Sequence, residues 1–384
     1  MNDAYSAPVE MGKHALFGRM EDARAMFDVS FELTARCNLN CRHCYINLPT
    51  GDRTARAVEI TVDEIDRWTD DALKLGTLWC LLTGGEPLLR PDFSAIYLML
   101  KKKGLLVTVF TNAVLIKEEH IALFRQYPPR EIEVSVYGVT PETYGRLTRK
   151  PDTFEAFIRG VELLEASGVR VSYKSVAMRA NYDEMATIAD FCRERSSEPF
   201  RFDPFLHLRY DRNPVRNAEI WAERLNAAKI VALEESDSAR LKSVEQDCEH
   251  GPEVDHHTTH DSLFHCGIGK AAGGTITYDG KFLPCGELRH PDCAYDLRRG
   301  TLEEAWRVFT PGVMSMKTGN AEYHEHSQNE GHVNLCMSCP AHNFLETGEL
   351  DNPVDYFCEV AHARERVVER NLHHKIALMT AADG

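Results

Sequence analysis

The chain has 384 residues, 43% of them hydrophobic and 27% charged, a composition typical of a globular protein with one large core and a smaller unit. The 44 Lys and Arg residues against 59 Asp and Glu residues give a formal net charge of −15, which would repel a phosphate backbone and argues against a nucleic-acid partner. No run approaches the ~20 apolar residues of a membrane span, and no signal peptide is recognisable, so we expect a cytoplasmic protein without a membrane partner. Twelve cysteines in that compartment indicate metal binding rather than disulfides.

Residues 1–28 are expected to form an N-terminal arm, and residues 29–234 alternate short apolar runs with amphipathic stretches. Six runs have the two-sided apolar character of buried parallel strands, at 29–34, 78–83, 105–111, 131–138, 169–178 and 199–208. Helix signals separate them, such as the capping box from Thr61 to Glu64. Because no G-x-G-x-x-G turn follows a strand, we predict an α/β fold with a partial parallel (β/α)6 barrel and an active site at the carboxyl ends of its strands.

The rest of the chain is predicted to form a linker and a second domain. Residues 235–263 are polar without a usable period, which indicates a linker or lid. Residues 264–384 are interpreted as a smaller α+β domain. That domain opens with two strand-like runs around Asp279 and Gly280, a hairpin signal, and ends in a long helix near residues 354–372.

Three cysteines, Cys37, Cys41 and Cys44, follow the first predicted strand in a C-x3-C-x2-C loop. Three thiolates on one loop can bind one [4Fe-4S] cluster and leave one iron open for the amine and carboxylate of a small ligand. A zinc knuckle would need a fourth ligand, and His43 is the only local candidate. The spacing, with Tyr45 after the third cysteine, resembles the radical S-adenosylmethionine (SAM) superfamily. The resemblance implies that these cysteines hold the catalytic cluster and that Tyr45 contacts SAM.

A second motif, Gly84-Gly85-Glu86-Pro87, follows the second predicted strand. The glycines let backbone groups approach a ligand, and Glu86 can accept a hydrogen bond from a ligand ammonium group. This segment resembles the GGEP motif that holds the SAM amino group in the family. The resemblance also implies SAM contacts at later strand ends, from Thr111, Asn112, Ser135, Tyr137, Lys174 and Asp203. Solvated polar residues at strand ends are the competing interpretation.

The C-terminal region carries five further cysteines of interest, Cys266, Cys285, Cys336, Cys339 and Cys358. With the G-x4-C spacing that ends at Cys285, they resemble the SPASM or twitch domains that hold auxiliary iron-sulfur clusters. Residues 327–330 contain no cysteine where full SPASM domains have another C-x2-C. The resemblance therefore implies one auxiliary [4Fe-4S] cluster, bound by four of the five. Zinc at Cys336 and Cys339 is the alternative, because zinc ribbons share that spacing.

The resemblance implies that a ferredoxin- or flavodoxin-type donor reduces the first cluster, that SAM splits to a 5′-deoxyadenosyl radical, and that this radical takes hydrogen from a substrate. An auxiliary cluster could accept the electron left on the substrate, which makes the net reaction an oxidation. Several proteins with this C-terminal pattern modify peptides, so the first hypothesis is a maturase that forms an oxidative cross-link or similar modification in a ribosomally made peptide. The alternative is a dehydrogenase or epimerase of a small molecule such as a sugar or nucleoside. A non-catalytic electron carrier would have no need of the GGEP motif.

Overall fold

A computed structural model gives the fold and describes residues 24–249, 259, 261–266, 273–328, 335 and 339–382. Within this part of the chain nine strands form one sheet in the order β11-β10-β9-β1-β4-β5-β6-β7-β8. Their bounds are β1 Asp28–Thr34, β4 Trp79–Gly84, β5 Leu106–Thr111, β6 Glu131–Ser135, β7 Val171–Val176, β8 Arg201–Asp203, β9 Gly274–Ile276, β10 Lys281–Leu283 and β11 Tyr295–Asp296. Strands β1 and β4 to β8 pair in parallel, which confirms the six predicted strands and the partial barrel.

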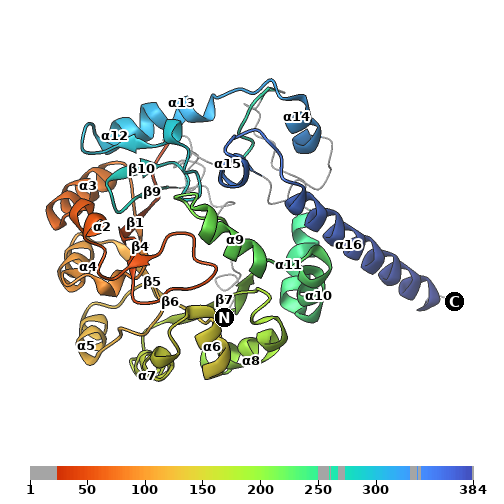
Figure 1. Cartoon of the computed structure of the whole chain (residues 1–384), viewed down its shortest axis with the longest axis horizontal. Coiled ribbons are helices and arrows are strands. Elements are labelled where there is room, and N and C mark those ends of the chain that lie inside the picture. Colours follow the sequence, from red (N-terminus) through yellow and green to blue (C-terminus); the bar gives the residue numbers. More distant parts are fainter. Residues whose placement is uncertain are drawn as a thin grey trace, which may run out of the picture.

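Helices surround this curved sheet, and Figure 1 shows α3 to α8 around the outside of the strands and α16 projecting away from the body. The helices of the first half are α2 Arg53–Val58, α3 Val62–Lys74, α4 Phe93–Lys102, α5 Glu118–Gln126, α6 Pro141–Thr148, α7 Phe154–Glu165, α8 Met185–Arg195 and α9 Pro214–Glu223. Those of the second half are α10 Ala227–Ser236, α11 Ser238–Glu249, α12 Leu302–Glu304, α13 Thr310–Met314, α14 Ala321–Gln328, α15 Pro340–Thr347 and α16 Asp355–Ala382. A short pair, β2 Arg36–Cys37 with β3 Leu48–Pro49, stands apart from the main sheet.

Local chemistry explains where these helices begin and end. The Thr61 hydroxyl accepts from the Glu64 N–H while the Glu64 carboxylate accepts from the Thr61 N–H, so the predicted capping box starts α3. After α4 the chain turns at Gly104, whose φ of 89° favours glycine. The buried face of α3, with Ile65 and Trp68, then packs into the core formed with the strands. Helix placement therefore follows from caps and one apolar face.

The C-terminal part of the chain continues the barrel sheet. Strand β9 pairs in parallel with β1, and β10 pairs antiparallel with both β9 and β11, which confirms the predicted hairpin around Gly280. Phe282 and Trp306 belong to the same apolar core as Phe31 of β1. The sheet and the core thus cross the boundary predicted at residue 264, and the division into domains stays a prediction.

The predicted linker is not irregular throughout, because residues 238–249 form α11. Val244 of this helix packs with Leu335 and with Ala361 of α16, and Leu241 packs against a second apolar cluster that includes Val231 of α10, so apolar contacts order a segment that is otherwise polar. Among the residues that the structure describes, no helix is both long and apolar enough to cross a membrane.

Candidate functional site

The carboxyl ends of the parallel strands surround a cavity of ≈150 Å³. Parallel strands all end at the same rim of the barrel, so residues far apart in the sequence meet there. Twelve of the predicted site residues line this cavity, namely Cys37, Cys41, Cys44, Tyr45, Gly84, Gly85, Thr111, Asn112, Ser135, Tyr137, Lys174 and Asp203. Glu86 and Pro87 are not among the lining residues.

The loop with the three cysteines is fixed by backbone hydrogen bonds to the end of α6. The Asn40 N–H donates to the Thr148 carbonyl and the Arg42 N–H to the Leu147 carbonyl, each at 3.0 Å. Around the sulfurs, the Cys37 Sγ accepts from the Leu39 N–H at 3.4 Å, and the Cys44 Sγ accepts from the Asn47 N–H at 3.3 Å. All three thiols therefore face the cavity from a preorganised loop.

Burial makes two of these thiols, Cys37 and Cys41, poor acids on their own. Burial, followed by the negative charges of Glu86 and Cys44, raises the pKa of Cys37. The pKa of Cys41 is raised by burial and by its two neighbours Cys44 and Cys37. Three clustered thiolates in such a place need a cationic group between them, and iron is such a group. The donor set and its burial fit a [4Fe-4S] cluster bound by these three residues.

Two arginines hold the cysteine loop from the outside, and sequence reasoning missed both. Arg209 donates through Nη1 to the carbonyls of Cys44 at 3.3 Å and Asn47 at 3.2 Å. Arg216, on α9, donates through Nη2 to the Cys41 carbonyl at 2.8 Å. They lie more than 160 residues from the loop, and no local pattern in the sequence connects them to it.

Burial also neutralises the histidine of the cysteine loop. Burial, and then the charge of Arg216, lowers the pKa of His43 to about 4. Its ring packs at 5.1 Å from that of Tyr137, another residue of the cavity wall. The neutral imidazole thus forms part of the wall between the loop and β6.

Glu86 lies behind the cavity wall, where its carboxylate accepts three hydrogen bonds. Oε1 accepts from the Thr111 hydroxyl at 2.8 Å and from the Leu88 N–H at 3.1 Å, and Oε2 accepts from the Asn112 N–H at 2.8 Å. Asn112 in turn donates through Nδ2 to Asn38 Oδ1 at 2.9 Å and to the Cys37 Sγ at 3.6 Å. Burial raises the pKa of Glu86 to about 7. The carboxylate thus positions the end of β5 and, through Asn112, the first cysteine.

Replacing Glu86 by glutamine is expected to weaken SAM binding about tenfold, which corresponds to about 1.4 kcal/mol. The amide NH2 must face either the Asn112 N–H or the Thr111 and Leu88 donors, and a buried donor without an acceptor costs about 1–3 kcal/mol. Equilibrium binding of SAM by the reconstituted protein, with Glu119→Gln on exposed α5 as control, measures the effect. Unchanged affinity in Glu86→Gln would contradict the positioning role.

An ion pair closes the floor of the cavity. Lys174 Nζ lies 2.5 Å from the Glu133 carboxylate and 3.7 Å from the centre of the Phe110 ring, and Arg201 pairs with Glu133 at 2.8 Å. Phe110 also lines a separate cavity of ≈400 Å³ at the opposite end of the barrel. The charge of Lys174 is therefore already paired, and its part in SAM binding stays a proposal.

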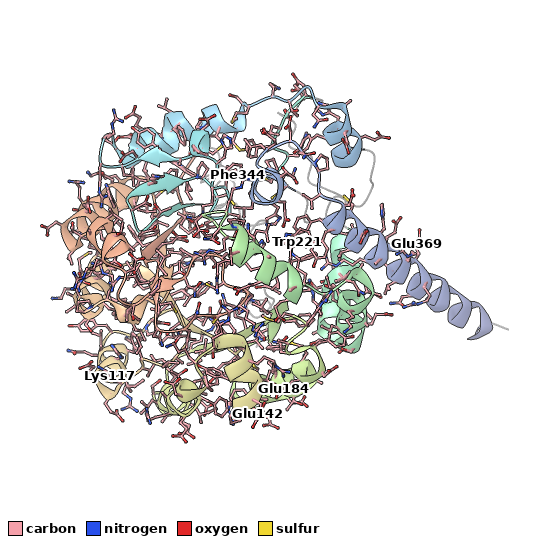
Figure 2. All side chains as sticks on the ribbon, viewed as in Figure 1. Lys117, Glu142, Glu184, Trp221, Phe344 and Glu369 are labelled. Atoms are coloured by element: carbon pink, nitrogen blue, oxygen red, sulfur yellow. The ribbon has the colours of Figure 1, made fainter. Side chains whose placement is uncertain are left out.

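The rim of the cavity meets the C-terminal part of the chain through aromatic and charged contacts. The rings of Tyr45 and Tyr210 lie 4.7 Å apart, and the Arg289 guanidinium lies 3.6 Å above the centre of the Tyr210 ring. Arg289 also pairs with the buried Glu32 of β1. Figure 2 labels Trp221 on α9 and Phe344 on α15, two helices that flank this junction. The segment after the third cysteine is thus connected to both halves of the chain.

Three of the five C-terminal cysteines influence one another electrostatically. Burial, followed by the charges of Glu287, Cys339 and Cys266, raises the pKa of Cys285 to about 11. Burial raises the pKa of Cys339, but hydrogen bonds from the side chain and backbone of His342 more than offset it and the pKa is lowered. Cys358 is buried on α16. Cys336 lies outside the described residues. Three thiols that influence one another fit part of the ligand set of a cluster.

Residues 31–192 match the model of the radical SAM superfamily. This part of the chain is a radical SAM domain. An AdoMet-dependent heme synthase of Methanosarcina barkeri (strain Fusaro / DSM 804) is 25% identical over 356 residues, which cover 84% of this chain and 93% of the relative.

Two further proteins resemble this chain, one in sequence and one in fold. The antilisterial bacteriocin subtilosin biosynthesis protein AlbA of Bacillus subtilis (strain 168) is 28% identical over 195 residues, 50% of this chain and 42% of its own. Streptococcus suis SuiB bound to S-adenosylmethionine has a similar fold, with a TM-score of 0.64, 17% identity, and coverage of 87% of this chain and 78% of SuiB. The similarity in fold to SuiB therefore extends over both the barrel and the C-terminal part.

Proposed function

We propose that this radical SAM enzyme cleaves SAM reductively at the cavity formed by Cys37, Cys41 and Cys44 and abstracts hydrogen from a substrate above it. The observation that carries the proposal is the convergence of the three thiols, the GGEP backbone and four strand ends on one cavity. A cluster held by these cysteines would supply one electron to bound SAM, whose sulfur–C5′ bond would break to give methionine and the 5′-deoxyadenosyl radical that abstracts hydrogen.

The residues around the cavity are proposed to bind SAM, to orient it and to shield the radical from water. Gly84 and Gly85 offer backbone groups to the SAM amino acid moiety, Thr111 and Asn112 are held in place by Glu86, and Tyr45 covers the third cysteine. Apolar wall residues, Leu39, Ile46 and Val176, limit the access of water, which protects a reactive radical. Ser135, Tyr137 and Asp203 complete the polar wall of the SAM site.

We infer one auxiliary [4Fe-4S] cluster in the C-terminal part, held by Cys266, Cys285 and Cys339 with Cys336 or Cys358 as the fourth ligand. The mutual influence of the first three thiols supports this ligand set. Such a cluster would take up the electron left after hydrogen abstraction, so the overall reaction would be an oxidation of substrate.

A peptide is our first candidate substrate, modified by an oxidative cross-link. Support comes from the similar fold of SuiB bound to the precursor peptide SuiA and from the sequence match to AlbA. A porphyrin is the second candidate, because the heme synthase match covers most of both chains. A sugar or nucleoside is the third candidate, and its support is the match to GTP 3',8-cyclase of Aquifex aeolicus (strain VF5), which is 33% identical over 179 residues but covers only 44% of this chain and 53% of its own.

The first two candidates are separated by supplying each to the reduced enzyme with SAM. A short precursor peptide encoded beside the gene should raise 5′-deoxyadenosine formation and lose two hydrogen atoms by mass spectrometry. Iron-coproporphyrin III, the tetrapyrrole in the name of another relative, serves as the competing probe. A rise with porphyrin alone, together with a change in its mass, would replace the first candidate by the second.

We further propose that a small acidic ferredoxin- or flavodoxin-type donor docks on a basic surface beside the cysteine loop, formed by Arg42, Arg146, Arg149, Lys150 and Arg216. The surface is continuous: Arg42 Nε donates to the Arg146 carbonyl at 2.9 Å, and the Glu219 carboxylate pairs with Arg149 at 2.7 Å and Arg216 at 2.9 Å. Glu219 and Glu223 pair with three of the five cations, Arg42, Arg149 and Arg216, in a chain of net charge −15. Since Arg216 contacts the Cys41 carbonyl, the loop lies one side chain beneath this surface.

The double variant Arg146→Glu/Lys150→Glu is expected to need about tenfold more flavodoxin for half-maximal SAM cleavage, because charges at the rim of an interface mainly set the association rate. Both residues are exposed. Dithionite needs no docking surface and should drive the variant within about twofold of wild type. Lys117→Glu is the matched control, since Figure 2 shows Lys117 on the side of the barrel away from α9. An equal loss with both reductants would contradict the docking role.

A further inference from the structure

Three metal-ligating side chains meet where the barrel joins the C-terminal part. His207 follows β8, Glu287 lies two residues after Cys285, and His342 is on α15. One ring nitrogen of each histidine and one carboxylate oxygen of Glu287 all lie within 4.8 Å of one another. None of these residues lines the SAM cavity. The three therefore form a cluster apart from the cysteine loop.

The cluster contains a buried nitrogen without a hydrogen-bond partner. His207 Nδ1 is inaccessible to solvent and has no partner within the described part of the chain. Leaving a buried polar nitrogen unsatisfied costs free energy, so such an atom in a folded protein calls for a ligand that the fold alone does not supply.

We propose that His207, Glu287 and His342 bind one divalent transition-metal ion, of the zinc or ferrous type. Two imidazoles and one carboxylate are a ligand set that both ions accept, with an open position left for water or substrate. Ligand atoms on a four-coordinate ion lie roughly 3.4 Å apart, so the present spacing has to close by up to about 1.4 Å. The centroids of the two rings lie 4.6 Å apart, with the ring planes inclined by 29°.

Neighbouring groups hold two of the three ligands in orientation. The Tyr210 hydroxyl donates to Glu287 Oε2 at 3.2 Å, and the His342 side chain is hydrogen-bonded to Cys339. Such outer contacts set the orientation of metal ligands. The three ligands come from three separate segments, so the ion would tie the barrel rim to the loop after β10 and to α15. This role is independent of SAM cleavage.

Zinc content and zinc K-edge X-ray absorption of tag-free protein, reconstituted with iron and sulfide and then given zinc, test the site. Wild type should retain about one zinc per chain with nitrogen and oxygen ligands at about 2.0–2.1 Å. His207→Ala and Glu287→Gln should each lower zinc retention at least about fivefold, because two remaining ligands bind weakly. Zinc should also raise the melting temperature of wild type and not that of His207→Ala.

The matched control is His290→Ala, which removes another imidazole from the C-terminal part and contacts Phe344 rather than the cluster. It should retain zinc as wild type does. Sulfur ligands at about 2.3 Å would place the zinc on cysteines and overturn the proposal. Equal zinc in wild type and His207→Ala, or none in wild type, would overturn it as well.

Discussion

Replacing Gly84 by alanine is expected to lower the free energy of unfolding by about 3–5 kcal/mol and to abolish SAM binding. Gly84 has a φ of 124°, a conformation that side chains rarely adopt. A Cβ there would also lie closer than 3.0 Å to the Thr34 carbonyl oxygen and 3.3 Å from the Thr34 backbone nitrogen. The added Cβ on β4 would collide with backbone atoms of Thr34 at the end of β1. The collision can be removed only if the two strand ends move apart. That separation would pull the GGEP segment away from the cysteine loop.

The matched control is Gly104→Ala, which isolates the steric term. Gly104 also has a positive φ, 89°, but a Cβ there would meet no atom within 4 Å. Gly104→Ala should lower the free energy of unfolding by only about 1 kcal/mol, because only the backbone conformation disfavours alanine there. Urea denaturation of both variants measures the difference. Similar losses for the two would show that the close approach of β1 and β4 is not what requires glycine at position 84.

Replacing Arg289 by methionine is expected to lower the free energy of unfolding by about 3–5 kcal/mol at neutral pH, because the buried Glu32 would lose its counter-charge. Arg289 donates through Nη1 to Glu32 Oε2 at 3.3 Å and through Nη2 to Oε1. Burial raises the pKa of Glu32 above its ordinary value of 4.5 even with Arg289 present, and without the guanidinium the pKa rises further.

The stability that Arg289→Met loses should increase as the pH rises. A carboxyl group with a raised folded-state pKa binds more protons folded than unfolded, so stability falls as the pH rises above the unfolded value near 4.5. The deficit relative to wild type should therefore be small near pH 4 and grow toward pH 7. The double variant Glu32→Gln/Arg289→Met removes the unpaired charge and should recover most of the stability. No recovery would show that stacking of Arg289 on Tyr210, rather than the charge pair, dominates.

The barrel and most of the cavity could be predicted from the sequence because their signals are local. Each of the six parallel strands is an apolar run of its own, and the cysteine loop and GGEP segment directly follow two of them. A parallel barrel brings all strand ends to one rim, so residues as distant as Thr111 and Asp203 could be assigned to one place.

What could not be predicted depends on contacts between distant segments. The pairing of β9 with β1 joins residues about 245 positions apart, and a three-residue strand gives no sign of its partner. Arg209 and Arg216 donate hydrogen bonds to backbone carbonyls of the cysteine loop. Every residue has a backbone carbonyl, so these contacts cannot be recognised from the sequence. The sequence did not show that the Glu86 carboxylate accepts from the Thr111 hydroxyl and from the N–H groups of Leu88 and Asn112, and its contact with SAM stays a prediction. The interaction of Lys174 with Glu133 was equally hidden.

The measurement that tests the central claim most directly is reductive SAM cleavage by anaerobically reconstituted protein, comparing wild type with a Cys37→Ala/Cys41→Ala/Cys44→Ala variant. Iron content and EPR are recorded on the same samples. The account predicts that wild type forms 5′-deoxyadenosine with dithionite, and that the variant forms none while retaining about four irons per chain from an auxiliary cluster. Cleavage that persists in the variant, or its absence in fully loaded wild type, would contradict the assignment of this cavity as the site of radical SAM chemistry.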